Sequence, residues 1–275
     1  MKTFKCHIWS FIVVILFAIT AFGQVVFSPK DEVEKSVKSV PCPQNERMEG
    51  VRRLFKEAGA KDEEIVIEKF EKDKTANVVV RKKGETDETV IIGAHYDRTN
   101  LGCGVLDNWT GVTIISHIYK TVRPLSTKKS YIFVAFDREE EGLRGSNQMA
   151  KAMERPAIDK TCAMVNFDTF GMAAPMGLRN ASSPKLIKLA ERLAEGAKFK
   201  FVAVDIEGAT TDSASFRDRK IPSIAIGGVG ANWTQILHTS DDKVSKVNMD
   251  SVYMGYRFGL AYLAEIDATP CQDYR

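Results

Sequence analysis

The sequence predicts an α/β fold: a three-layer α/β/α sandwich in which helices flank a mixed, mostly parallel sheet. Strand-like and helix-like segments alternate from residue 89 onward, which is typical of parallel sheets. The segment 89–97 is a nearly continuous apolar run, as expected for a strand that is buried on both faces. A chain of 275 residues that is 44% hydrophobic is also long enough to bury one large core.

The elements expected before residue 89 do not alternate between strand and helix as the later ones do. Residues 24–45 carry charges and several prolines, so they are expected to form an extended N-terminal segment. The helical spacing of Met48, Val51, Phe55 and Ala58 predicts a helix that Gly59 could end. Strands are expected at 64–70 and 76–84, and the turn-like residues 82–88 predict a hairpin to the strand 89–97.

The later elements follow the alternating pattern. No linker interrupts residues 46–267, so residues 46–275 are expected to form a single domain. Apolar spacing predicts helices at 111–120, 146–153, 184–193 and 252–263, and strands at 130–137, 162–168 and 222–228.

The first 23 residues are expected to be a signal peptide. Lys2 and Lys5 precede an apolar stretch from Ile8 to Phe22, and small residues surround position 23. A retained membrane anchor is the alternative, but the stretch is short for a spanning helix. We therefore expect an exported protein, periplasmic or secreted, with no stable membrane span after cleavage.

The number of cysteines predicts disulfides, and the net charge argues against a nucleic-acid partner. Cys42, Cys103, Cys162 and Cys271 remain after cleavage, and an even number in an exported chain suggests disulfides with three possible pairings. We expect Cys42 to pair with Cys271, which would join the two ends; free buried thiols are the alternative. The net charge is only +3 and no basic patch with interleaved aromatic residues appears, so no nucleic-acid partner is expected.

Acidic residues and histidines follow several predicted strands at the point where each strand ends. In a doubly wound sheet those ends converge on one edge, where sites form. Candidate ligands there are two imidazoles and three carboxylates: His95, Asp107, Glu140, Asp168 and His238.

This mixture of nitrogen and oxygen ligands suits zinc better than calcium or magnesium. Its excess of negative charge suits two ions that share a carboxylate, about 3.5–4 Å apart. Of the adjacent glutamates, one can bind metal while the other acts as general base toward a metal-bound water. Each signal has a plainer interpretation, since the run Glu139–Glu141 is also typical of a solvated loop.

In combination and in order, these motifs resemble metallopeptidase family 28, the co-catalytic zinc exopeptidases. The resemblance spans roughly residues 46–267. It rests on "IIGAHYD" (91–97), "GVLDNWTGV" (104–112), "FDREEEGLRGS" (136–146), "VNFDTFG" (165–171) and "LHTSDD" (237–242), of which the EE-x-GL-x-GS string is the most specific.

The resemblance implies a role for each residue. Asp107 resembles the carboxylate that bridges both zinc ions, His95 and Asp168 the other ligands of one ion, and Glu140 and His238 those of the second. Glu139 matches the general base, and Asp97 the acid that orients the first histidine. The family implies an aminopeptidase that binds two zinc ions and releases the N-terminal residue of peptides.

Three alternatives stay open, one of which is a carboxypeptidase or dipeptidase within the same family. Glutaminyl-peptide cyclotransferases share the fold and most of these residues but use a single zinc; the compact EE-x-GL-x-GS string favours a peptidase. An exported binding module with a defunct site is less consistent with a complete ligand set. Ser213 stands where many members have a histidine. His117 is expected to be a packing or surface histidine rather than a ligand, and Trp109 and Trp233 are expected to pack in the core, with the border of a substrate pocket as the alternative.

Overall fold

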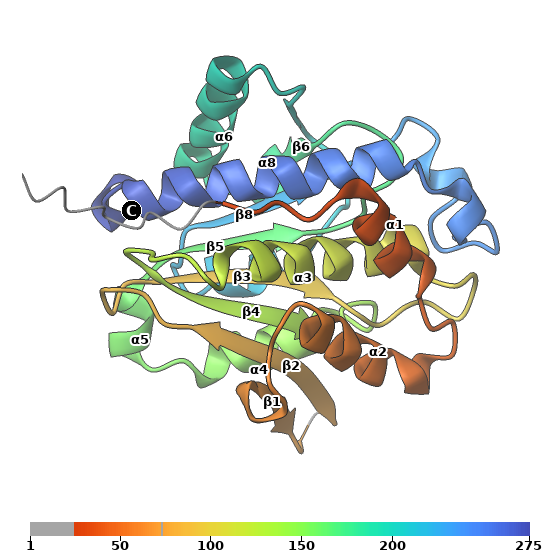
Figure 1. Ribbon diagram of the computed structural model, residues 1–275, viewed down its shortest axis with the longest axis horizontal. Coiled ribbons are helices and arrows are strands. Elements are labelled where there is room, and N and C mark those ends of the chain that lie inside the picture. Colours follow the sequence, from red (N-terminus) through yellow and green to blue (C-terminus); the bar gives the residue numbers. More distant parts are fainter. Residues whose placement is uncertain (1–24, 73) are drawn as a thin grey trace, which may run out of the picture.

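The computed structural model describes residues 25–72 and 74–275, and the predicted signal peptide lies outside them. Its centre is an eight-stranded sheet with the order β1-β2-β4-β3-β5-β8-β6-β7 (Figure 1). Over the described part of the chain, no helix has the length and apolar character needed to cross a membrane.

The sheet is mixed, as predicted. The central strands β4, β3, β5 and β8 run parallel, whereas β1 and β2 continue the sheet in antiparallel fashion beyond β4, and β6 pairs antiparallel with β8. The strands are β1 Ile65–Phe70, β2 Thr75–Lys82, β3 Thr89–His95, β4 Ser130–Phe136, β5 Thr161–Phe167, β6 Met176–Leu178, β7 Val202–Val204 and β8 Ser223–Gly227.

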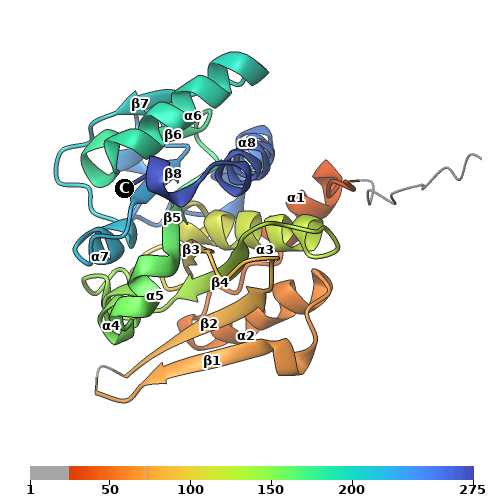
Figure 2. The same ribbon diagram turned by 90° about the vertical axis from the view of Figure 1, so that its left-hand side faces the viewer.

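Helices cover both faces of this sheet, which confirms the predicted three-layer α/β/α fold (Figure 2). Successive residues of a strand point to opposite faces, so in β3 Val90 and Ile92 join one core while Ile91 joins the other. One layer holds α1 Lys30–Lys38, α2 Gln44–Glu57, α3 Thr110–Val122, α6 Pro184–Ala197 and α8 Met249–Ala268; the other holds α4 Arg144–Ala152, α5 Arg155–Lys160 and α7 Ser213–Arg217.

The predicted hairpin at 82–88 is wrong. Strands β2 and β3 are not neighbours, because β4 lies between them and pairs with both. Residues 85 and 86 instead bond to the segment before β4: Glu85 N–H donates to the Thr127 carbonyl over 2.9 Å and Thr86 N–H to that of Lys128 over 2.8 Å. Turn-forming residues indicate that the chain reverses, but not which strand fills the space between the two arms.

The N-terminal segment 24–45 is not extended throughout, because α1 lies within it. Pro29 directly precedes this helix, at a position where a missing N–H costs no helical hydrogen bond. Acidic residues in the first turn and lysines in the last complement the helix dipole. Val33 and Val37 are buried against the main core, so burial of one face favours the helix over an extended chain.

Both disulfides differ from the expected pairing. Cys42 bonds to Cys103 and Cys162 to Cys271, with Cα–Cα distances of 4.6 and 4.8 Å. Cys42 precedes α2 and faces the loop after β3, whereas Cys271 follows α8 and lies beside the start of β5. The contacts that decide the pairing are therefore long-range.

Candidate metal centre

The predicted site residues gather at one edge of the sheet. In the parallel centre, His95 at the end of β3 is in register with Phe136 at the end of β4, and Phe167 of β5 with Ile226 of β8. The loops after these strands therefore begin at a common edge. A cavity of about 460 Å³ opens there, and all the predicted site residues except Asp97 line it.

Two groups of candidate ligands share Asp107. In the first, His95 Nε2 lies 3.0 Å from Asp107 Oδ1 and 3.5 Å from Asp168 Oδ1. In the second, His238 Nε2 lies 3.0 Å from Asp107 Oδ2 and 3.2 Å from Glu140 Oε2. Within each group the candidate ligand atoms lie within 4.8 Å of one another. Asp107 thus presents one oxygen to each group, as a bridging carboxylate would.

The raised pKa values of the two histidines indicate that the cluster of candidate ligands is short of positive charge. Burial alone would lower the pKa of His95, but Glu139 and the hydrogen bonds to Asp107 and Asp168 raise it well above the usual value. Hydrogen bonds to Asp107 and Glu140 raise the pKa of His238 to about 10. Without a cation, the carboxylates hold protons on both imidazoles. Divalent cations would supply that charge and leave the ring nitrogens free to coordinate.

An orphaned oxygen supports the same conclusion. Glu140 Oε1 is buried and has no hydrogen-bond partner among the described residues. A buried carboxylate oxygen without a partner is costly unless a cation or water neutralises it. The donor set therefore fits a divalent cation such as zinc.

Asp242 holds the backbone that presents Asp107. Its Oδ1 accepts the N–H groups of Val105 and Leu106, both over 2.7 Å, and its Oδ2 accepts that of Asp107 over 3.2 Å. Burial raises the pKa of Asp242 to about 6. Asp242 ends the quoted "LHTSDD" string, but the sequence alone does not reveal this role, because the partners of Asp242 are more than a hundred residues away.

Arg47 fixes the beginning of the same loop. Its fully buried guanidinium donates to the backbone carbonyls of Tyr96, Cys103 and Gly104, the last two over 2.9 and 3.0 Å. Burial lowers the pKa of Arg47 to about 10. Together with the Cys42–Cys103 disulfide, this side chain ties α2 to the segment that leads to Asp107.

Asp97 connects the first histidine to the glutamate pair. Its two oxygens accept the backbone N–H groups of Glu139, over 3.0 Å, and Glu140, over 3.1 Å. One of these oxygens also lies 3.3 Å from His95 Nδ1. A carboxylate at the second ring nitrogen is the usual means of orienting a histidine ligand.

Asp212 is a further buried acid next to the cluster that the sequence analysis did not select. Burial raises the pKa of Asp212 to about 7. The charge of Asp168 also raises this pKa, whereas that of His95 lowers it. Its neighbour Ser213, which replaces the expected histidine, does not line the cavity. Instead, the Ser213 hydroxyl donates to the Ala181 carbonyl over 2.9 Å.

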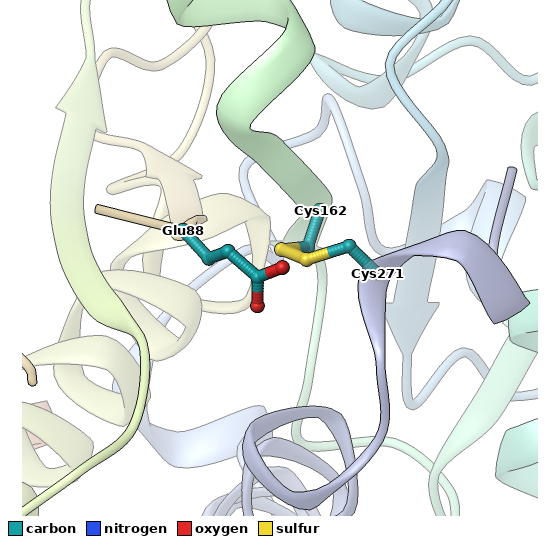
Figure 3. A group of neighbouring side chains, drawn as sticks. All are labelled: Glu88, Cys162 and Cys271. Carbon is teal, nitrogen blue, oxygen red and sulfur yellow. A yellow bond between two sulfur atoms is a disulfide. The ribbon is translucent and has the colours of Figure 1, made fainter. Parts of the chain in front are cut away.

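A third set of ligand-type residues does not form a metal site. Glu88, Cys162 and Cys271 lie close together, but both sulfur atoms belong to the disulfide (Figure 3). A metal would need the thiolate form of these cysteines.

Of the residues that were expected to serve packing, Trp109 and His117 do so and Trp233 does not. Trp109 is fully buried, and its indole N–H donates to the Ser36 carbonyl over 3.0 Å. His117 is also buried, so it is a packing histidine rather than a surface one. Trp233, in contrast, lines the cavity rather than the core, together with other apolar side chains: Leu143, Leu178, Ile206, Val229 and Leu237.

Known proteins with similar sequences include leucine aminopeptidases of fungi. A probable leucine aminopeptidase of Trichophyton verrucosum is 26% identical over 80% of this chain and 63% of its own. Leucine aminopeptidase 1 of Trichoderma harzianum is 25% identical over 80% of this chain and 61% of its own. The chain thus spans less than two thirds of the length of these relatives.

Solved structures share the fold. The LapA aminopeptidase of Legionella pneumophila superposes with a TM-score of 0.76 at 18% identity, over 90% of this chain and 74% of its own. A glutaminyl cyclase of an Acidobacteriales bacterium gives 0.72 at 17% identity, over 87% of this chain and 94% of its own. The model of peptidase family M28 matches residues 77–257, which hold every candidate ligand described above, and the chain therefore belongs to peptidase family M28.

Proposed function

We propose that this protein is an exported zinc-dependent aminopeptidase that hydrolyses the N-terminal residue of peptides. The observation that carries the proposal is the pair of ligand groups joined by Asp107, with Glu139 beside them in the same cavity. Membership of peptidase family M28 and the names of the fungal relatives support it.

The ligand groups would each hold one ion. His95, Asp107 and Asp168 form one set, and Asp107, Glu140 and His238 the other. Imidazole nitrogens and carboxylate oxygens are ligands that catalytic zinc takes in proteins. When bound, the ions would polarise the scissile carbonyl and make water acidic enough to lose a proton at neutral pH.

Proton transfer is assigned to Glu139. In the proposed mechanism its carboxylate takes a proton from the attacking water and delivers it to the departing amine. Its backbone is anchored by Asp97, which also lies beside His95. This shared anchor keeps the base and the first ligand group in a constant relative position, which is a requirement for efficient proton transfer.

Export is part of the proposal. The predicted signal peptide, residues 1–23, is compatible with passage across a membrane, and the Cys42–Cys103 and Cys162–Cys271 disulfides fit an oxidising compartment. Residues 46–275 would then be the catalytic domain, with α1 packed on its surface against α3 and α8.

Peptides that differ only at the amino end test this function. Purified protein should release the first residue from a peptide with a free amino terminus and leave the acetylated peptide intact. A chelator should abolish release and zinc should restore it. Cleavage of the acetylated peptide, or release that persists after complete metal removal, would contradict the proposal.

A glutaminyl-peptide cyclotransferase with a single zinc is the second candidate. It is favoured by one observation: this chain covers 94% of the bacterial cyclase but 74% of LapA. The compact EE-x-GL-x-GS string, residues 139–146, favours the peptidase instead. A peptide with N-terminal glutamine separates the two functions, since a cyclase yields pyroglutamyl peptide and an aminopeptidase yields free glutamine.

A further inference from the structure

Glu207 is a charged residue of the cavity that has no part in the proposed metal binding or proton transfer. The other charged or titratable residues of the lining are the candidate ligands and Glu139: His95, Asp107, Glu139, Glu140, Asp168 and His238. No lysine or arginine of the described chain lines this cavity. Glu207 is therefore the carboxylate left to meet a charged group of the substrate.

A tight turn holds Glu207 at the cavity wall. The Ala209 N–H donates to the Ile206 carbonyl over 3.2 Å, and Gly208 has a φ of +76°, as at the third position of a type II turn. Glu207 then occupies the second position, at the tip. The Asn180 side chain donates to the Ile206 carbonyl over 2.8 Å and anchors the base of the turn.

The Glu207 side chain is exposed and has no ion-pair partner in the described part of the chain. The nearby acid Asp205, in contrast, is already paired with Arg179 at 2.8 Å. The cavity lining also has apolar surface, to which Ile206, the chain neighbour of Glu207, and Trp233 contribute. A long cationic side chain matches this combination, because its methylene stem lies on apolar surface while its charged end stays near solvent and a carboxylate.

We propose that Glu207 extends the substrate range of the cavity to peptides whose first residue is lysine or arginine. This inference rests on the proposed aminopeptidase function and adds a class of first residue to it. Apolar first residues use the same walls without the carboxylate, whereas an acidic first residue meets the like charge of Glu207. The expected order of efficiency at low salt therefore places lysyl and arginyl substrates well above glutamyl substrates.

The test compares kcat/KM for leucyl, lysyl, arginyl and glutamyl nitroanilides. The variant is Glu207→Gln, and the matched control is Glu195→Gln, which removes the same charge from an exposed position on α6 outside the cavity. The lysine-to-leucine ratio of kcat/KM should fall about two- to fivefold in E207Q, as expected for an exposed charge pair. It should not change in E195Q.

Salt provides an independent readout. Raising the ionic strength from about 0.05 to 0.5 M should lower the lysine-to-leucine ratio of the unmodified protein and have little effect on that of E207Q. An unchanged ratio in E207Q, or an equal fall in E195Q, overturns the assignment while leucyl hydrolysis still supports the aminopeptidase. Failure of the unmodified, zinc-loaded protein to hydrolyse any of the substrates overturns the proposed function, and this inference with it.

Discussion

Replacing His117 with glutamine should remove part of the protein's loss of stability in acid. His117 lies in α3 and joins the N-terminal segment to the domain: its Nδ1 is 2.8 Å from Ser28 Oγ and its Nε2 is 3.0 Å from Ser36 Oγ. Burial lowers the pKa of His117 to about 4, with Lys120 acting in the same direction and Glu32 in the opposite one. The folded protein therefore keeps this ring neutral.

The size of this loss of stability follows from the difference in the pKa of His117 between the folded and the unfolded chain. A histidine in the unfolded chain titrates near pH 6.5. Because the folded pKa of His117 is lower, the unfolded chain takes up a proton first as the pH falls, and stability present above about pH 6.5 is lost progressively down to about pH 4. Between pH 8 and pH 5 this amounts to on the order of 2 kcal/mol.

Urea unfolding at pH 8, 6.5 and 5 measures this loss in the unmodified protein and in His117→Gln. Chelator is present throughout, so that protonation of the candidate ligands contributes equally to both proteins. The unmodified protein should lose about 2 kcal/mol more than the variant between pH 8 and pH 5. Parallel stability curves over that range would refute the assignment of a neutral, buried His117.

Three further predictions concern the site and its support. Glu139→Gln should lower kcat about a hundred- to ten-thousand-fold with zinc content unchanged, as measured by metal analysis and nitroanilide hydrolysis. Asp97→Asn should weaken zinc binding about 10- to 100-fold in a competition titration, because the ring of His95 loses its partner. Replacing Cys42 and Cys103 with serine should lower the free energy of unfolding by about 4 kcal/mol in urea, since their disulfide closes a 61-residue loop.

Neighbouring residues provide the controls. Glu141 is exposed and paired with Arg138 and Arg144, so Glu141→Gln should change kcat less than about twofold. An equal loss in both glutamine variants would count against Glu139 as the base. Unchanged zinc affinity in Asp97→Asn, or a loss below about 1 kcal/mol without the disulfide, would contradict the other two predictions.

The sequence was most informative about features that depend on neighbouring residues, such as the strands and the polar residues that directly follow them. Apolar runs that end in acidic residues or histidine predicted both the parallel centre of the sheet and the edge at which His95, Asp107 and Asp168 meet. The predicted parallel strands are confirmed, and the predicted site residues do lie close together, because parallel strands place their carboxyl ends at one edge whatever the details of the helices.

Long-range contacts account for what was missed. Arg47 and Asp242 serve the loop before Asp107 from positions far away in the chain. Arg47 belongs to no motif, and the "LHTSDD" string that contains Asp242 does not reveal which backbone groups this side chain binds. The partner of Cys42 depends on the path of the loop after β3. Trp233 is a large apolar residue of the kind usually found in a core. Only the arrangement of the loops around the cavity shows that Trp233 lines the cavity while Trp109 is buried.

Metal titration of the metal-free protein tests the central claim most directly. Zinc is added stepwise, and both the bound metal and the hydrolysis of leucyl nitroanilide are measured at each step. The shared Asp107 predicts two ions bound per chain, full activity only when both are present, and loss of the two-ion state in Asp107→Asn. Saturation at one ion with full activity, or undiminished hydrolysis in the metal-free protein, would contradict the account.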